Sequence, residues 1–94
     1  MRKLIFDQDA FDDFADWGIY NRNVFKRIYE LLKDIRRHPF EGIGKPEPLK
    51  GNLSGYCGLA RAVRRITDEH RLVYKVESPD HILIISVKGH YGDK

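Results

Sequence analysis

The chain has 94 residues, which is enough for one small domain spanning 1–94 and not for two. A hydrophobic share of 41%, with five Phe, five Tyr and one Trp, can form a compact core, so the 33% charged share does not indicate disorder. We expect neither a membrane span nor a signal peptide, because no run approaches ~18–20 apolar residues and the N-terminus turns acidic early.

The charges are distributed unevenly. Seventeen Lys and Arg against fourteen Asp and Glu give a net charge of +3; acidic residues crowd positions 7–16, and the chain is basic between positions 26 and 71. The basic side could hold nucleic acid, and the alternative is a solvated mixed surface. The single cysteine, Cys57, cannot form an internal disulfide and fits a reducing cytoplasm.

The first half of the chain predicts a strand and a helix. Residues 4–6 are a short apolar run suited to a strand. Asp7 can then cap a helix over about 8–19. Its apolar residues follow helical spacing and are expected to form a core stripe, comprising Phe11, Phe14, Ala15, Trp17 and Gly18.

A second helix is predicted over about 22–37. Asn21 is its cap, and Pro39 stops it. One face recurs with helical spacing as Val24, Ile28, Leu31 and Ile35. The opposite face is basic, so this helix should pack on a core with one side only.

The second half predicts strands. After a connector over 39–52 rich in Pro and Gly, strands are expected at 64–67, 71–76 and 82–87, with a turn at 78–80. In the strand at 71–76, Leu72, Tyr74 and Val76 alternate with Arg71, Val73 and Lys75. The order of elements indicates an α+β fold, an antiparallel sheet with helices on one face.

One carboxylate in the connector is held unusually stiffly. Glu47 lies between Pro46 and Pro48, with Lys45 and Lys50 on either side. Each proline fixes its own φ and favours an extended conformation for the residue before it. The pattern fits a carboxylate that must meet an anionic substrate in one orientation.

Two further groups are candidates for chemistry on phosphate. Arg64, Arg65 and Arg71 are predicted on strands, where guanidinium forks can bind phosphate, although sheet-edge charge that prevents aggregation is the alternative. His90-Tyr91 follows the last strand, where a histidine can reach solvent and titrate near neutrality, although a frayed terminus is equally open. The four histidines lack paired ligand spacing, so no metal or other cofactor is expected.

Together these residues fit RNA cleavage without a metal. A base removes the proton from the 2′-OH, arginines stabilise the charge on the pentacoordinate phosphorus, and an acid protonates the departing 5′-oxygen. The substrate must be RNA, because the nucleophile is the 2′-OH.

Several motifs resemble the YoeB toxins of the RelE superfamily, in order along nearly the whole chain. They cover positions 36–42, 44–50, 52–56, 64–74 and 90–91, including Gly44-Lys45-Pro46-Glu47-Pro48-Leu49-Lys50 and the terminal His90-Tyr91. The resemblance implies a cytoplasmic bacterial toxin that enters the A site of the 70S ribosome and cuts mRNA. It also implies a YefM-like antitoxin, operator DNA bound only through that antitoxin, a possible homodimer, and two helices on a curved, mostly antiparallel sheet.

The resemblance also implies roles for individual residues. Glu47 is similar to the general base, His90 to the general acid, Arg71 to the transition-state stabiliser and Tyr91 to the terminal residue that orients substrate. Lys50 and Arg65 match family positions that contact RNA or its reacting phosphate. Lys45, and Arg64 of the arginine cluster, are further expected RNA contacts.

The chain departs from the family pattern after Tyr56, where the family usually has Trp-Ser and then the pair of arginines. This chain has seven residues, 57–63, before Arg64, which is five more than the family and lacks the Trp. An odd insertion in a strand exchanges its faces, so these residues either loop out or re-aim Arg65. The alternative function is therefore a catalytically impaired protein that binds RNA, the ribosome or the antitoxin as a corepressor. A generic basic RNA-binding domain would leave the proline-flanked Glu47 without a purpose.

Overall fold

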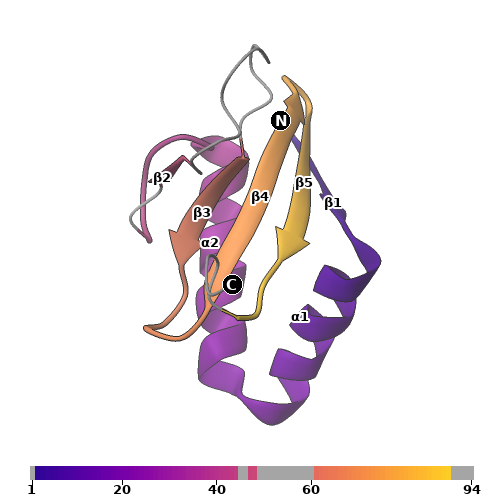
Figure 1. Ribbon diagram of the computed structural model, residues 1–94, viewed down its shortest axis with the longest axis vertical. Coiled ribbons are helices and arrows are strands. Elements are labelled where there is room, and N and C mark those ends of the chain that lie inside the picture. The colour runs from indigo at the N-terminus through magenta and orange to yellow at the C-terminus, as the bar shows by residue number, and fades with distance from the viewer. Residues whose placement is uncertain (1, 45–46, 49–60, 90–94) are drawn as a thin grey trace.

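The computed structural model describes residues 2–44, 47–48 and 61–89. Their element order is β1 (Lys3–Phe6), α1 (Gln8–Tyr20), α2 (Arg22–Arg37), β2 (Glu47–Pro48), β3 (Arg61–Arg65), β4 (Arg71–Ser78) and β5 (His81–Ser86). The strands form one sheet in the order β1-β5-β4-β3-β2, which is antiparallel except for the parallel pair of β1 and β5. The predicted α+β fold with a mostly antiparallel sheet is confirmed (Figure 1).

Both helices begin at the predicted capping residues. The side chain of Asp7 accepts from Asp9 N–H, and the side chain of Asn21 accepts from Val24 N–H at 3.2 Å. These bonds satisfy backbone donors that the first helical turn leaves without a partner. The second helix ends at Arg37, with His38 as its C-cap just before Pro39, as predicted.

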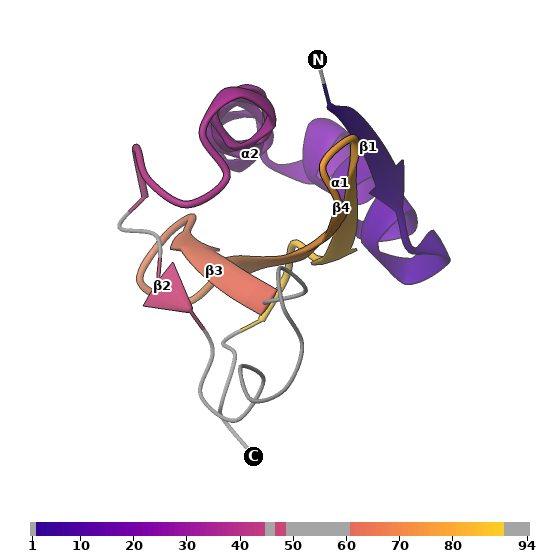
Figure 2. The same cartoon turned by 90° about the horizontal axis from the view of Figure 1, so that it is seen from above.

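The core lies between the helices and one face of the sheet, which we call the core face. Fully buried Ile28, Leu31 and Ile35 of α2 pack in one cluster with Leu72 and Tyr74 of β4. Figure 2 shows the sheet curving around α2. The predicted alternation of β4 is confirmed for Leu72, Tyr74 and Val76, which join the core cluster, whereas Val73 is also buried but lies outside that cluster.

The predicted core stripe of α1 is partly wrong. Ala10 is the residue of α1 that is fully enclosed, Phe14 and Trp17 are partly buried, and Phe11 and Ala15 are exposed. The helix lies beside β1 at the edge of the sheet (Figure 1), so only a narrow part of its surface reaches the core.

The strand before β4 and the connector also differ from those expected. The strand predicted over 64–67 runs instead from Arg61 to Arg65. Ile66 and Thr67 leave it because both of their N–H groups donate to the His70 carbonyl, at 3.0 and 3.1 Å, and form the turn into β4. The predicted connector contains the two-residue β2, which pairs with β3. Pro48 has no N–H to give a second neighbour, so it suits a sheet edge.

Candidate functional site

Four residues are linked in a row across the sheet, at the end where β3 and β4 meet their connecting turn. The links are backbone hydrogen bonds and strand pairing. Gly44 C=O accepts from Arg65 N–H at 2.7 Å, Arg65 is the register partner of Arg71, and Arg71 N–H donates to Gly89 C=O at 2.9 Å. Gly44 and Gly89 directly precede two predicted site residues in the sequence. We call these four residues the arginine row; it joins parts of the chain that are far apart in sequence.

Arg71 is held by the turn that precedes it. Its Nη1 donates to the carbonyl oxygens of Thr67 at 2.5 Å, His70 at 3.1 Å and Asp68 at 3.3 Å. These contacts fix the orientation of the guanidinium. A cation whose position is set in advance can stabilise a developing negative charge without reorganising during the reaction.

Arg65 lies on the face of the sheet opposite the core, which we call the outer face. Its side chain is 45% exposed and reaches Asp68 at 3.5 Å. The β3–β4 register is regular over five pairs and places Arg61 opposite Lys75 on the same face. The outer face is therefore basic around Arg65, whose register partner on β4 is Arg71.

Arg64 does not belong to this basic face, and its predicted contact with RNA is wrong. The residue is 0% exposed. Its guanidinium donates to the Asp34 carboxylate, to three carbonyls of the connector and to the Tyr74 hydroxyl: Asp34 Oδ2 2.7 Å, His38 O 2.6 Å, Glu41 O 2.9 Å, Ile43 O 2.8 Å and Tyr74 Oη 3.2 Å. Consecutive strand residues point to opposite faces, so only one of the two adjacent arginines can reach the outer face.

The Arg64 cluster ties the connector to the core. Tyr74 donates its hydroxyl proton to Pro39 C=O, and Asp34 Oδ2 accepts from Ile43 N–H at 3.1 Å. Burial opposes ionisation of Asp34, but the hydrogen bonds from Arg64 and Ile43 and the positive charge of Arg64 outweigh it and lower its pKa. Burial raises the pKa of the Tyr74 phenol, and the Arg64 hydrogen bond opposes that rise.

The Gly42–Gly44 stretch fits closely around this cluster. Gly44 has φ +81°, and a Cβ there would lie 2.6 Å from Leu31 Cδ2. At Gly42, with φ +117°, a Cβ would lie 2.0 Å from Asp34 Oδ2. Glycine is required at both positions because the backbone is left-handed and the neighbours leave no room. The connector therefore leaves the core in one direction toward β2.

The other predicted site residues are described in part or not at all. For Glu47 the structure gives the backbone, which pairs with Val63 in the row that continues to Val73. The remaining predicted positions lie outside the described residues, namely Lys45, Lys50, His90 and Tyr91. Most of the extra segment after Tyr56 lies outside them too.

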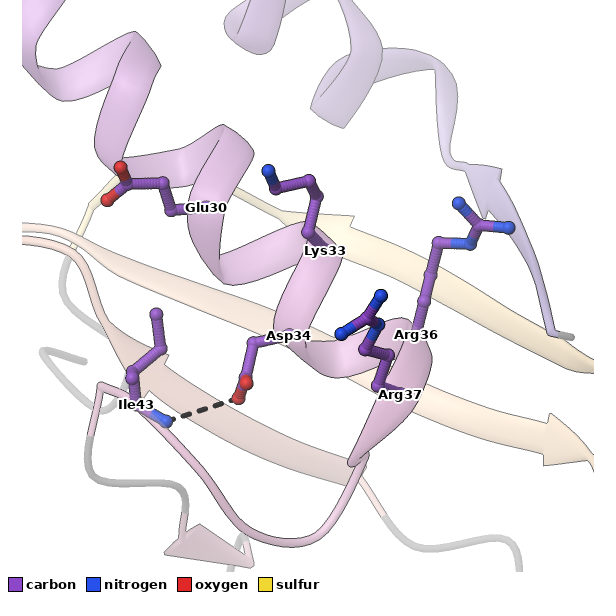
Figure 3. A pocket seen from close by; sticks show the side chains of 6 residues that line it. All are labelled: Glu30, Lys33, Asp34, Arg36, Arg37 and Ile43. Carbon is purple, nitrogen blue, oxygen red and sulfur yellow. Dashed lines mark hydrogen bonds between the residues drawn. The ribbon is translucent and has the colours of Figure 1, made fainter.

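A separate cleft of about 440 Å³ lies along α2 beside the connector (Figure 3). It is lined by Glu30, Lys33, Asp34, Arg36, Arg37 and Ile43, so it contains no predicted site residue. Two of the lining residues, Asp34 and Ile43, are joined by a hydrogen bond from Ile43 N–H to Asp34 Oδ2 (Figure 3). It adjoins the Arg64 cluster through Asp34 and Ile43, and none of its lining residues belongs to the arginine row.

Within residues 2–44, 47–48 and 61–89, no group of three or more His, Cys, Asp or Glu could hold a metal ion. In the same part of the chain, no helix is both long and apolar enough to cross a membrane.

A model of the YoeB-like toxin of bacterial type II toxin–antitoxin systems matches residues 6–91. The chain belongs to this family. Toxin YoeB of Escherichia coli K12 is 51% identical over 89 residues, covering 95% of this chain and 99% of that protein. Toxin RelK of Mycobacterium tuberculosis is 47% identical over 91 residues, covering 97% of this chain and all of that protein.

Solved structures agree with this assignment. The YoeB dimer from Staphylococcus aureus superposes with a TM-score of 0.81 at 45% identity, covering 96% of this chain and 98% of that one. The YoeB–YefM complex from the same organism gives 0.77 at 44% identity, covering 97% and 99%. An archaeal RelE–RelB complex from Pyrococcus horikoshii, at 14% identity, 97% coverage of both chains and a TM-score of 0.65, shares the fold alone.

Three side chains that support the site were not predicted from the sequence of this YoeB-like toxin. Asp34 pairs with Arg64, His70 accepts from Gly89 N–H at 2.9 Å, and the Trp17 indole N–H donates to Val87 C=O at 3.0 Å. Strand alternation could have assigned Arg64 to the core and so indicated that it needs a carboxylate partner. No local pattern marks the other two, because their partners lie in a distant segment.

Proposed function

We propose that this YoeB-like toxin is a ribosome-dependent endoribonuclease that cleaves mRNA in the ribosomal A site and so inhibits translation in the cytoplasm. The observation that supports it best is the arginine row. Arg71, held by the carbonyls of its turn, is linked through Arg65 to Gly44 and directly to Gly89. The segments that lead to the proposed base and acid therefore start from the same pair of arginines.

The proposed reaction is a transfer of the phosphate from the 5′-oxygen to the 2′-oxygen without a metal. Glu47 takes the proton of the 2′-OH as its oxygen forms a bond to phosphorus. Arg71 balances the extra negative charge of the pentacoordinate phosphorus. The bond to the 5′-oxygen breaks as His90 donates a proton to it, which leaves a 2′,3′-cyclic phosphate. Tyr91 orients the substrate.

The proposed RNA contacts are Lys45, Lys50 and Arg65. Arg65 supports this role because it is exposed on the basic outer face next to Arg71. Lysine and arginine contacts to phosphates release counterions, so binding should weaken steeply as salt rises. Arg64 is no longer part of this set, since its guanidinium is bound within the protein.

The proposed protein partners follow from relatives of this chain. One solved complex from Staphylococcus aureus pairs YoeB with YefM, and another structure is a YoeB dimer. We propose a YefM-like antitoxin and a homodimer for this chain as well. Operator DNA would be bound only through the antitoxin.

The test is cleavage of ribosome-bound mRNA by the wild-type protein and by Glu47→Ala and His90→Ala. We expect each substitution to slow cleavage at least about 100-fold, because each removes a proton-transfer group. A 2′-deoxy nucleotide at the cut site should block the reaction. Equal activity of the three proteins would contradict the mechanism.

Antitoxin binding separates the proposed enzyme from the catalytically impaired alternative. Expression without the antitoxin should arrest growth and cleave mRNA if the proposal is correct. Harmless expression with retained binding to the YefM-like product of a neighbouring reading frame would favour the corepressor. Failure to co-purify with that product would contradict the proposed partner, and the proposed nuclease activity would then be judged by the cleavage assay alone.

A further inference from the structure

The His70 imidazole contacts the segment that leads to the proposed acid. Gly89 N–H donates to Nδ1 of His70 at 2.9 Å. A backbone N–H can only donate, so Nδ1 carries a lone pair and the neutral ring has its proton on Nε2. The contact therefore requires one particular tautomer of this histidine.

Neighbouring groups hold the same segment at two more points. Arg71 N–H donates to Gly89 C=O at 2.9 Å, so both backbone polar groups of Gly89 are bound by the consecutive residues His70 and Arg71. Trp17 of α1 donates its indole N–H to Val87 C=O at 3.0 Å. The Trp17 ring also meets the His70 ring edge to face, with centroids 4.9 Å apart. We call these contacts the His70 clasp.

His70 is itself fixed by the turn. Its N–H donates to Thr67 Oγ1 at 3.0 Å, and its carbonyl accepts from Ile66 N–H and Thr67 N–H. The same carbonyl accepts from Arg71 Nη1 at 3.1 Å. The imidazole and the Arg71 guanidinium are thus attached to one rigid turn, and a shift of either would disturb the other.

We propose that His70 is a positioning residue: through the His70 clasp it sets Gly89 against Arg71 and so fixes the backbone directly before the proposed general acid, His90. This inference rests on the proposed function, because it assigns His90 the role of general acid. A displacement of about 1 Å at an acid can cost on the order of 100-fold in rate, so a contact one residue away is enough to matter.

The clasp can be tested without any activity. In the full-length wild-type protein, imidazole ¹⁵N shifts should show His70 protonated on Nε2 and not on Nδ1. The Gly89 amide should exchange with solvent at least about tenfold more slowly than in His70→Leu, which removes the acceptor. A proton on Nδ1, or rapid exchange of Gly89 in the wild type, would overturn the clasp.

Its role in positioning is tested by kinetics on ribosome-bound mRNA. We expect His70→Leu to lower kcat at least about tenfold with KM changed less than about twofold, because binding groups remain in place. His70→Asn, whose side-chain oxygen lies near the position of Nδ1, should recover most of kcat and of the Gly89 protection. The matched control is His81→Leu, because exposed His81 contacts Ser78 on the far end of β4, and it should change nothing.

The outcomes separate the two proposals. A wild-type protein that protects Gly89 but does not cleave mRNA would refute the proposed function and leave the clasp intact. Lost Gly89 protection with unchanged kcat, or no recovery in a folded His70→Asn, would refute positioning and leave the proposed function intact. If His70→Leu does not fold, the wild-type ¹⁵N shifts and His70→Asn still decide the question.

Discussion

The arginines on the two faces of the sheet differ in their surroundings. On the core face, Arg64 is enclosed and bound by a carboxylate, three carbonyls and a phenol. On the outer face, Arg65 is partly exposed and paired only with the solvated Asp68 at 3.5 Å among the described contacts. One residue of separation decides whether a guanidinium organises the fold or can meet a ligand. The connector before Glu47 depends on the first kind, and the proposed RNA surface depends on the second.

Replacing Arg64 by Met should have the largest effect on stability. The substitution preserves much of the side-chain volume but removes the guanidinium that donates to the connector carbonyls and to Asp34, which retains its bond from Ile43 N–H. We expect the free energy of unfolding in urea to fall by about 3 kcal/mol, as for other broken buried pairs. The control is Arg65→Met at the next position, which should change it by less than about 0.5 kcal/mol. Equal losses would contradict the distinction between the faces.

The two glycines at the ends of the arginine row offer a second comparison. Gly44 and Gly89 have φ of +81° and +88°, but a Cβ at Gly44 would meet the enclosed Leu31, whereas at Gly89 nothing lies within 4 Å. Gly44→Ala should lower the unfolding free energy by about 2 kcal/mol and Gly89→Ala by about 1 kcal/mol, because only the first adds a clash to the backbone strain. Thermal or urea unfolding measures both. The interpretation fails if the order is reversed.

Lowering the pH should reduce the free energy of unfolding, because Asp34, the partner of Arg64 on the core face, becomes protonated. Its folded-state pKa lies below the unfolded value of about 3.9, so its contribution is complete above pH 4 and is lost as pH falls through the lowered pKa. The slope from this one group cannot exceed about 1.4 kcal/mol per pH unit. Between about pH 5 and about pH 2, where carboxylates titrate, the free energy of unfolding in urea should depend less on pH in Asp34→Asn than in the wild type. An unchanged slope would exclude Asp34 as a source of it.

The smallest effect is expected at Asp68 on the outer face. Its contact with Arg65 joins two solvated side chains, which contributes little to stability. Asp68→Asn should leave the unfolding midpoint unchanged, while RNA affinity rises by less than about threefold because the charge of Arg65 is no longer offset. Filter binding at two salt concentrations measures this change. A large loss of stability would show that the outer-face pair is structural after all.

Much of the fold could be predicted from local patterns. Helix caps at Asp7 and Asn21, the alternation around Tyr74 and the stop before Pro39 each depend on neighbours in sequence, and each was correct. The parallel pairing of β1, the short β2 and the exposure of Phe11 depend on where distant segments meet, and periodicity does not encode that.

The same division applies to the candidate site. Residue type was enough to propose the arginine cluster and the proline-flanked Glu47. It was not enough to tell which of two adjacent arginines faces the core, although strand alternation carried that information. The link from His70 to Gly89 spans nineteen residues and could not be read from either segment alone.

The parallel pairing of β1 with β5 bears on how the protein is made. Lys3 pairs with His81 and Phe6 with Ile84, so β1 cannot complete its pairing until β5 has been synthesised. Long sequence separations slow folding, and β5 also carries the chain onward to Gly89. We therefore expect the row that joins Arg71 to Gly89 to be absent from the nascent chain until β5 and Gly89 have emerged, and any activity that depends on this row should begin only after that.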